Sequence, residues 1–422
     1  SPEQLTTFLE NHGLFDNYQS GFRKKHSTET ALLKVSSDIL MSADSKKYTV
    51  LVLLDLSSAF DTVDHTIMIN RLHDSVGMSG SVLKWFSSYL SGRSFSVYVN
   101  QIMSETTQLS CGVPQGSVLG PILFLLYILP LGQIISKFSD ISYHLYADDI
   151  QLYCSFKDTE FHKLSSLTNC LASIKQWLSD NFLLLNSEKT ETLIIAPECK
   201  IPQIKQYIAD LGSSVQPSLR SLGVVFDTAM SLENHSKQLV RNCYFQLRNI
   251  SKLRPFIPQI KQYIADLGVS LQPSLRTLGV FDAAMSLENH SKQLVRNCYF
   301  QLGNISKLRP LVSKGELEMI IHAFISSRLD YCNSLFTCLS KKELNRLQVV
   351  QNSAARLLTH INKRDHITPV LAALHWLLVQ YRIQFKIIVL TFKALHGLAP
   401  PYISELIQLH TPTHSLRSLG QS

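Results

Sequence analysis

The stretch Tyr146-Ala147-Asp148-Asp149 places two adjacent carboxylates between two apolar segments, residues 141–145 and 150–153. β-Branched and aromatic side chains are frequent in both segments, which predicts a strand, a tight turn and a second strand. A turn can direct both carboxylates toward one pocket, where they repel each other and lose hydration. Divalent cations would neutralise such a pair, so the stretch predicts a metal site, with a solvated Asp-Asp hairpin turn as the alternative.

A third carboxylate, Asp55, directly follows the continuous apolar run Val50–Leu54. Such a run is typical of a buried central strand, and neighbouring strands could bring its end to the Asp148–Asp149 turn. Three converging carboxylates with room for substrate phosphates form the two-metal arrangement for phosphoryl transfer. We therefore predict Asp55 and Asp148 as ligands of Mg²⁺ or Mn²⁺, with Asp149 completing or tuning the metal site.

Composition places the chain among globular proteins, because 45% of its 422 residues are hydrophobic and 17% are charged. The net charge of +8 is unevenly distributed: residues 1–202 carry 15 basic and 20 acidic side chains, and residues 203–422 carry 25 and 12. An acidic first part suits a cation site, and a basic second part suits a phosphate backbone. Ordinary surface charge could account for part of this asymmetry.

The eight cysteines are scattered, without a Cys-x-x-Cys pair or zinc-ligand spacing, as is typical of reduced intracellular thiols. No signal-peptide pattern opens the sequence, so we expect a nuclear or cytoplasmic location and no secretion. Ser117–Ile135 is long and apolar enough to suggest a membrane span, but glycines and prolines interrupt it. We therefore expect a buried helical segment there and no membrane partner.

Helical periodicity is found over residues 28–41, 61–76, 82–90 and 161–182, with Asp61 and Asp64 expected at a helix N-terminus. Strands are expected over residues 50–54 and 193–195, and alternation over residues 95–99 predicts a half-buried strand. This mixture predicts an α+β fold in which an antiparallel sheet carries helices on one face.

Residues 203–258 and 259–313 are nearly identical copies, and the second copy lacks one residue inside a predicted strand. One deletion in a strand reverses the facing of the side chains that follow, so we expect the first copy to occupy the native place. Residues 314–422 are predicted to be helical and basic, with an apolar stripe between Leu344 and Leu358. The tail after Pro400-Pro401 is expected to fray.

Ordered motifs extend this pattern: Gln19–Arg23 (QSGFR), Val52–His65 (VLLDLSSAFDTVDH), Gly112–Phe124 (GVPQGSVLGPILF), the YADD stretch at 146–149 and Leu185–Glu191 (LNSEKTE). Together they resemble the reverse transcriptase of non-LTR retrotransposons of the jockey-like LINE kind, over nearly the whole chain. The resemblance implies an RNA-directed DNA polymerase that extends a DNA primer on an RNA template with dNTPs.

The resemblance also implies a right-hand polymerase architecture. Partial fingers would occupy residues 1–49 and the palm residues 50–202. Two copies of a primer-grip and thumb unit would follow at residues 203–258 and 259–313, before a helical thumb and C-terminal region at 314–422. The family's upstream fingers segment and its endonuclease precede the motifs found here and are not contained in this sequence, and the oligomeric state is left open.

For single residues, the resemblance implies that Phe60 selects deoxynucleotides beneath the sugar, and that Gln115 and Gly116 contact the nucleotide and template. It implies a leaving-group proton donor at Lys189, and Arg23 and Tyr146 complete the predicted substrate contacts. Without the resemblance, other roles fit these residues equally well. Phe60 could be a core residue, Gln115-Gly116 a turn before a helix, Lys189 a surface residue, and Arg23 part of a solvated basic cluster.

Two other functions are compatible with the sequence. A truncated, inactive retroelement remnant would keep the fold and at most bind nucleic acid through its basic part. A two-metal nuclease would use the same carboxylates, but it has no need of a nucleotide pocket such as the Gln115-Gly116 and Lys189 motifs suggest.

Overall fold

The computed structural model describes residues 2–99, 102–114, 116–208, 214–230, 313–362 and 364–407. The chain divides into two compact units. The first comprises Ser1–Met230 with Ile388–Ser422, and the second comprises Ser231–Ile387.

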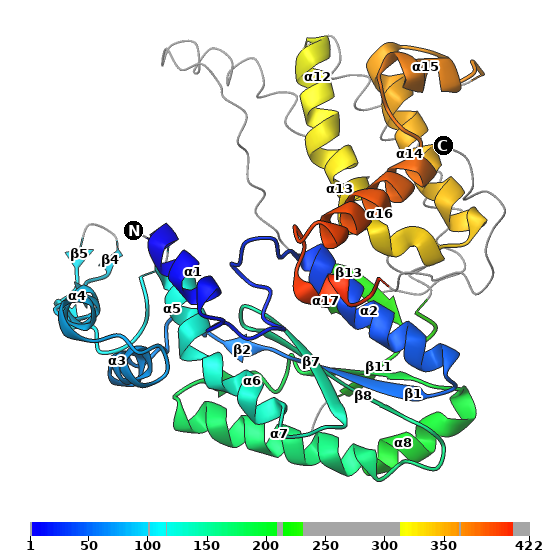
Figure 1. Ribbon diagram of the computed structural model, residues 1–422. Coiled ribbons are helices and arrows are strands. Elements are labelled where there is room, and N and C mark those ends of the chain that lie inside the picture. The colour runs from blue at the N-terminus through cyan, green and yellow to red at the C-terminus, as the bar shows by residue number, and fades with distance from the viewer. Residues whose placement is uncertain are drawn as a thin grey trace, which may run out of the picture. The chain divides into compact units, whose positions relative to one another are not determined.

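A five-stranded sheet in the order β11-β10-β1-β8-β7 forms the centre of the first unit (Figure 1). Its strands are β1 (Tyr48–Leu54), β7 (Ile141–Tyr146), β8 (Asp149–Phe156), β10 (Glu191–Ile195) and β11 (Ser214–Gln216). The predicted strand–turn–strand around the YADD stretch and the predicted central strand are therefore confirmed. All neighbouring strands are antiparallel except β10 and β11, which are parallel, so the predicted antiparallel sheet is correct except at this edge.

Helices cover both faces of this sheet, so the prediction of helices on one face is wrong. Val50, Val52 and Leu54 point into a core shared with α3 (His65–Asp74), α5 (Gly120–Tyr127), α6 (Leu129–Ile135) and α7 (Lys163–Asp180). The opposite face carries Tyr153, whose hydroxyl donates to Asp38 of α2 (Thr28–Asp44) at 2.5 Å. α2 and α7 accordingly lie on opposite sides of the strands (Figure 1).

The apolar segment at residues 117–135 forms α5 and α6, which are interrupted at Ile128. Pro130 lies in the first turn of α6, where its missing N–H is tolerated. Nearly every residue of α5 is buried in the core, as expected for a buried helical segment. Across the described ranges, no helix is long and apolar enough to cross a membrane.

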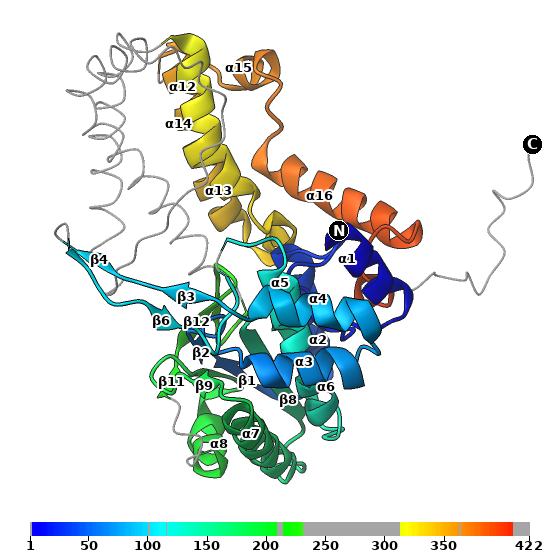
Figure 2. The same cartoon turned by 90° about the vertical axis from the view of Figure 1, so that its left-hand side faces the viewer.

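A ladder of short strands differs from its prediction. It consists of β3 (Ser94–Phe95), β4 (Tyr98–Val99), β5 (Ile102–Met103) and β6 (Thr107–Gln108), which pair as β3–β6 and β4–β5 (Figure 2). Phe95, Val97 and Val99 are 49%, 52% and 58% exposed, so the expectation of a half-buried strand is wrong. The side chains alternate in polarity, but no second layer covers either face of the ladder within the described residues.

The remaining elements of the first unit are α1 (Pro2–Asn11), β2 (Leu56–Ser57), α4 (Gly80–Leu90), β9 (Leu184–Leu185), a 3₁₀ turn (Glu198–Lys200), α8 (Ile201–Tyr207), β12 (Ser218–Ser221) and β13 (Val224–Asp227). β12 and β13 form a hairpin in the first copy of the repeat. The second copy lies outside the described residues apart from Ser313, so which copy occupies the native place stays a prediction.

The described part of the second unit, residues 313–362 and 364–387, is helical, in agreement with the helical prediction for residues 314–422. It contains α12 (Lys314–Ile321), a π-helical turn (His322–Ser326), α13 (Ser327–Asp330), a 3₁₀ segment (Asn333–Cys338), α14 (Lys341–Thr359), α15 (Thr368–Ala373) and the beginning of α16 (Val379–Leu395). The predicted stripe on α14 is buried at Leu347, Val350 and Ala354.

The expectation that the tail frays after Pro400-Pro401 is wrong as far as Ile407. α17 (Pro401–Ser404) follows the proline pair, and Tyr402 is among the largest fully buried side chains of the described chain. Pro401 is accepted because it lies in the first turn of α17, where its ring does not disturb a hydrogen bond.

Candidate active site

The acidic turn is a tight hairpin between β7 and β8. Tyr146 pairs with Asp149, which leaves Ala147 and Asp148 as the two turn residues. Ala147 has a φ of 56°, a left-handed conformation that L side chains adopt with strain. Asp148 is half-buried and Asp149 is exposed.

Strand register brings Asp55 to this turn. β1 pairs with β8 so that Leu54 lies opposite Ile150, and the next position along β1 therefore places Asp55 beside Asp149. The backbone register therefore sets Asp55 next to the acidic turn, and a metal site formed by the three carboxylates stays a prediction.

Lys189 joins the same group through a second pairing. Leu56 of β2 pairs with Leu185 of β9, and the Asn186 amide donates to the Asp55 carbonyl at 2.8 Å. These contacts hold the segment 184–189 against the end of β1. The Lys189 Nζ lies 3.4 Å from Asp55 Oδ2, with the lysine side chain 68% exposed. The four residues predicted for catalysis, Asp55, Asp148, Asp149 and Lys189, are thus gathered at one end of the sheet.

The carboxylates of the turn resist ionisation. Burial raises the pKa of Asp148, the charge of Asp55 adds to this rise, and Lys189 opposes it. Asp149 is exposed by surface area, but the surrounding protein removes part of its hydration. This loss, followed by the charges of Asp148 and Asp55, raises the pKa of Asp149 to about 6, and Lys189 again opposes the rise. A positive charge placed among these groups would favour their ionised forms, as expected of a cation site.

The donor set is suited to a hard divalent cation, but it is not a preassembled cage. Asp55 Oδ2 is buried and accepts no hydrogen bond from the residues that the structure describes, and the Lys189 ammonium lies 3.4 Å from it as an ion-pair partner. Carboxylate oxygens are the ligands preferred by Mg²⁺. Within the described ranges, however, no group of three or more His, Cys, Asp or Glu side chains is arranged to hold a metal ion. These carboxylates would supply only part of the ligands of such a cation.

The raised pKa of Asp149 predicts a pH-dependent stability. The folded chain holds this proton up to pH about 6, whereas the unfolded chain releases it near 3.8, so wild-type stability falls as pH rises between these values. Asp149→Asn removes the titrating carboxyl and with it this fall in stability. We expect the Tm of Asp149→Asn minus that of the wild type to become more positive between about pH 4 and pH 7.

Thermal melts in EDTA test this prediction. The change should be a few degrees at most, because solvent screens the exposed Asp149. Asp44→Asn, at an exposed carboxylate of α2, is the matched control and should show no such trend. A Tm difference for Asp149→Asn that does not vary with pH would contradict the electrostatic description.

Gln19 clamps the acidic turn from the N-terminal side. Its Oε1 accepts from the Ala147 amide at 2.9 Å and from the Gly21 amide at 2.8 Å, and its Nε2 donates to the Ala147 carbonyl at 3.3 Å. Residues 18–20 also run beside β7, with the Ser20 amide donating to the Leu145 carbonyl at 2.8 Å. Residues 19–21 form what we call the turn clamp. These bonds compensate for the strained conformation of Ala147.

Gly21 belongs to the clamp because only glycine fits there. A Cβ at this position would lie 2.3 Å from the Ala147 nitrogen and 2.9 Å from its Cα, which are backbone atoms that cannot turn aside. Neither Gln19 nor Gly21 is predicted from the sequence to have a role. Their only signal is the QSGFR motif, in which a substrate contact is predicted for Arg23 alone.

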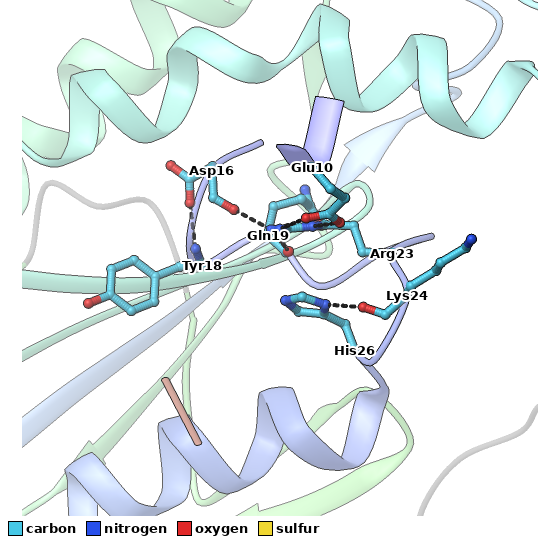
Figure 3. Close-up of polar contacts among 7 residues, drawn as sticks. All are labelled: Glu10, Asp16, Tyr18, Gln19, Arg23, Lys24 and His26. Carbon is cyan, nitrogen blue, oxygen red and sulfur yellow. Dashed lines mark hydrogen bonds and ion pairs between the residues drawn. The ribbon is translucent and has the colours of Figure 1, made fainter. Parts of the chain in front are cut away.

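Arg23 is engaged internally rather than presented to a substrate. It pairs with Glu10, Nη2 to Oε2, at 2.9 Å and donates through Nη1 to the carbonyls of Asp16 and Gln19 at 2.6 and 3.0 Å (Figure 3). Its guanidinium also lies 4.9 Å from the Phe15 ring centroid, and its side chain is only 8% exposed. The structure gives Arg23 the role of holding the loop that carries the clamp.

Phe60 and the glycine motif adjoin each other. The Phe60 ring stacks on Phe124 at 4.6 Å between centroids, and its carbonyl accepts from the Val113 amide at 2.9 Å. Gly112 packs closely on the backbone of the same loop, where a Cβ would lie 3.0 Å from the Asp61 carbonyl oxygen. Gly116 has a φ of 75°, which favours glycine, and Gln115 lies outside the described residues.

Two further acids are placed by the structure. Asp64 caps α3, with its Oδ1 accepting from the Ile67 amide at 2.8 Å, so its expected position at a helix N-terminus is confirmed. Asp61 lies in the loop before the helix, which begins later than predicted. Tyr146, the predicted substrate contact beside the acids, is half-buried at the end of β7.

Comparisons with known proteins identify a family for most of the first unit. The model of the family described as reverse transcriptase (RNA-dependent DNA polymerase) matches residues 3–226. A probable RNA-directed DNA polymerase from transposon X-element of Drosophila melanogaster is 26% identical over 258 residues, which make up 59% of this chain and 28% of that protein. The RNA-directed DNA polymerase from mobile element jockey of the same species is 29% identical over 183 residues, or 42% of this chain and 20% of that protein.

Among solved structures, telomerase from Candida tropicalis in complex with a fragment of telomeric RNA aligns with a TM-score of 0.40 and 11% identity. The alignment covers 89% of this chain and 56% of the telomerase chain. The chain spans 28% and 20% of the length of the two transposon proteins.

Proposed function

Because the chain belongs to the reverse transcriptase (RNA-dependent DNA polymerase) family, we propose that its first unit is the polymerase of a jockey-like LINE element. The proposed reaction joins dNTPs to the 3′-hydroxyl of a DNA primer annealed to an RNA template. The observation that carries the proposal is the strand register that sets Asp55 beside the Asp148–Asp149 turn, with Lys189 bound to Asp55.

In this proposal Asp55 and Asp148 hold Mg²⁺ or Mn²⁺, and Asp149 tunes the charge of the pair. The cation, when bound, supplies Lewis-acid activation of the primer hydroxyl and neutralises the triphosphate. The protein supplies alignment: the turn clamp fixes the backbone of Ala147, which precedes Asp148, and pairing of β1 with β8 fixes the strand that leads to Asp55. Alignment of reacting groups of this kind is worth several kcal/mol.

The five-stranded sheet is the proposed palm, with residues 1–49 as partial fingers and the β12–β13 hairpin as part of the primer grip. Phe60 is the proposed sugar contact, and Gly116, with Gln115, is proposed to border the nucleotide. Arg23 is left out of the proposed substrate contacts, because Glu10 and two carbonyls already occupy its donors.

Lys189 is the proposed proton donor to the leaving pyrophosphate. It is mostly exposed and paired only loosely with Asp55, so it can reach a bound triphosphate. We expect Lys189→Gln to slow single-nucleotide incorporation about 100-fold, the usual scale of general acid catalysis. Lys189→Arg keeps the charge beside Asp55 but holds its proton more tightly, so it should restore only part of the rate.

Rapid-quench kinetics with the exposed Lys175→Gln as control would measure these rates. An unchanged rate in Lys189→Gln would remove this residue from the mechanism. Full recovery in Lys189→Arg would assign it an electrostatic role instead of proton transfer.

Template-directed incorporation tests the proposed function. Purified chain is given an RNA template, an annealed DNA primer and one dNTP at a time in Mg²⁺ or Mn²⁺. We expect addition of the complementary dNTP only. Binding of the template–primer without extension would instead identify a remnant that only binds nucleic acid, and shortening of the primer would identify a nuclease.

A further inference from the structure

The described C-terminal segment of the first unit reaches the turn clamp. Residues 394–407, which we call the C-terminal anchor, include α17 and the end of α16. Ala394, Ala399, Tyr402 and Ile403 form a buried cluster that packs against Tyr18 and Leu33. Lys25 Nζ also donates to the Gly397 carbonyl at 2.7 Å. The anchor therefore covers the segment that leads into the clamp.

One hydroxyl connects the anchor to the clamp. Tyr402 Oη lies 2.7 Å from Ser20 Oγ and 3.1 Å from Thr30 Oγ1. Ser20 Oγ lies 2.8 Å from His144 Nε2, on strand β7 just before the acidic turn. Tyr402 is 2% exposed and His144 is fully buried, so these bonds form away from competing water.

One order of donors satisfies all of these hydroxyl contacts. Thr30 Oγ1 donates to the Ser27 carbonyl at 3.0 Å, so it accepts from Tyr402 Oη. Tyr402 then accepts from Ser20, and Ser20 accepts from His144 Nε2–H. Burial lowers the pKa of His144 to about 3, so its ring is neutral and one ring nitrogen carries the hydrogen. In this order the donors are His144, Ser20, Tyr402 and Thr30, and the last acceptor is the Ser27 carbonyl.

Ser20 is the middle residue of the clamp. Its neighbours on either side hold Ala147: Gln19 by hydrogen bonds and Gly21 by close packing. A shift of Ser20 along β7 would therefore move both contacts with the turn. The position of Ser20 is fixed by its backbone bond to Leu145 and by the hydroxyl chain.

We infer that Tyr402 is a positioning residue for the polymerase reaction, fixing Ser20 and through it the turn clamp on Ala147, the residue before Asp148. This inference rests on the proposed function for its kinetic consequence, but its structural consequence can be measured without activity. Tyr402 touches none of the carboxylates, so it acts only through Ser20 and the clamp. A role limited to filling the core would require the ring alone.

Tyr402→Phe separates these roles, because it keeps the ring and removes the hydroxyl. We expect kcat for incorporation by the full chain to fall about tenfold, the kinetic equivalent of one lost hydrogen bond in the aligned site. KM for dNTP should stay within about twofold, because the variant leaves the nucleotide contacts in place. The conservative Tyr381→Phe, at a tyrosine that is 51% exposed, is the matched control and should change neither value.

Amide hydrogen exchange supplies the readout that needs no activity. The Ala147 and Gly21 amides both donate to Gln19 Oε1, so their exchange reports the clamp directly. We expect faster exchange at both amides in Tyr402→Phe and not in Tyr381→Phe. Ser20→Ala should produce the same change, and the double variant should add little to either single variant, because one chain of bonds is broken in each case.

Unchanged exchange at these amides in Tyr402→Phe and Ser20→Ala would overturn the inference, whatever the activity. If Tyr402→Phe unfolds, Ser20→Ala alone decides between the same outcomes. If the wild type lacks polymerase activity while exchange rises as expected, the proposed function fails and the positioning contact stands.

Discussion

Asp148→Asn and Asp55→Asn should each reduce single-nucleotide incorporation by roughly a thousandfold or more. A cation stabilises the transition state of phosphoryl transfer by several kcal/mol, and each factor of ten in rate corresponds to about 1.4 kcal/mol. An amide cannot replace the ionised carboxylate as a ligand, although it preserves the side-chain shape. Rapid-quench kinetics on an RNA template with annealed primer measures the loss.

The control for this pair is Asp74→Asn, a substitution of an exposed carboxylate at the end of α3. It should retain the wild-type rate. Template–primer binding should also persist in Asp148→Asn, which shows that the lost rate reflects chemistry. Incorporation at a near-normal rate in either Asp55→Asn or Asp148→Asn would contradict the assignment of that carboxylate.

Gly21→Ala should be the most damaging substitution outside the carboxylates. Its Cβ would lie 2.3 Å from the Ala147 nitrogen, so either the clamp or the acidic turn must move. Overpacking of this kind costs about 1–3 kcal/mol of stability. A displacement of about 1 Å in a catalytic site can reduce the rate about 100-fold. We expect both effects, measured by chemical denaturation and by single-nucleotide incorporation.

Gly315→Ala is the matched control, because a Cβ there meets nothing within 4 Å and the residue lies in the first turn of α12. It should leave incorporation unchanged and stability unchanged or slightly higher, since alanine favours helix. A Gly21→Ala chain with wild-type stability and rate would show that the clamp does not determine the position of the turn.

Local sequence patterns predicted the central part of this fold. Val50–Leu54 is apolar at every position, and the segments around the YADD stretch are rich in β-branched and aromatic residues, so β1, β7 and β8 were identifiable. The continuous apolar run Val50–Leu54 also indicates that both faces of the sheet are covered. A strand with one solvent-exposed face would alternate apolar and polar residues instead. The prediction of helices on one face overlooked this lack of alternation.

Other features depend on contacts that sequence spacing does not reveal. Gln19 meets Ala147 across 128 residues, and Ser20 meets Tyr402 across 382. The internal role of Arg23 depends on its ion pair with Glu10, which lies on α1 and is not part of any of the sequence motifs. The alternation at residues 95–99 predicted a buried face, but burial requires a second layer, and the ladder that contains these residues remains exposed. The gathering of Lys189 with Asp55 was expected only from the family resemblance.

The most direct test of the central claim, that Asp55 and the Asp148–Asp149 turn form one cation site, is Mn²⁺ binding measured by electron paramagnetic resonance. The full chain is titrated in the presence of template–primer, beside Asp55→Asn, Asp148→Asn and Asp74→Asn. We expect the first two variants to weaken Mn²⁺ binding at least tenfold and Asp74→Asn to bind as the wild type does. Equal Mn²⁺ affinity in all four chains would contradict the claim.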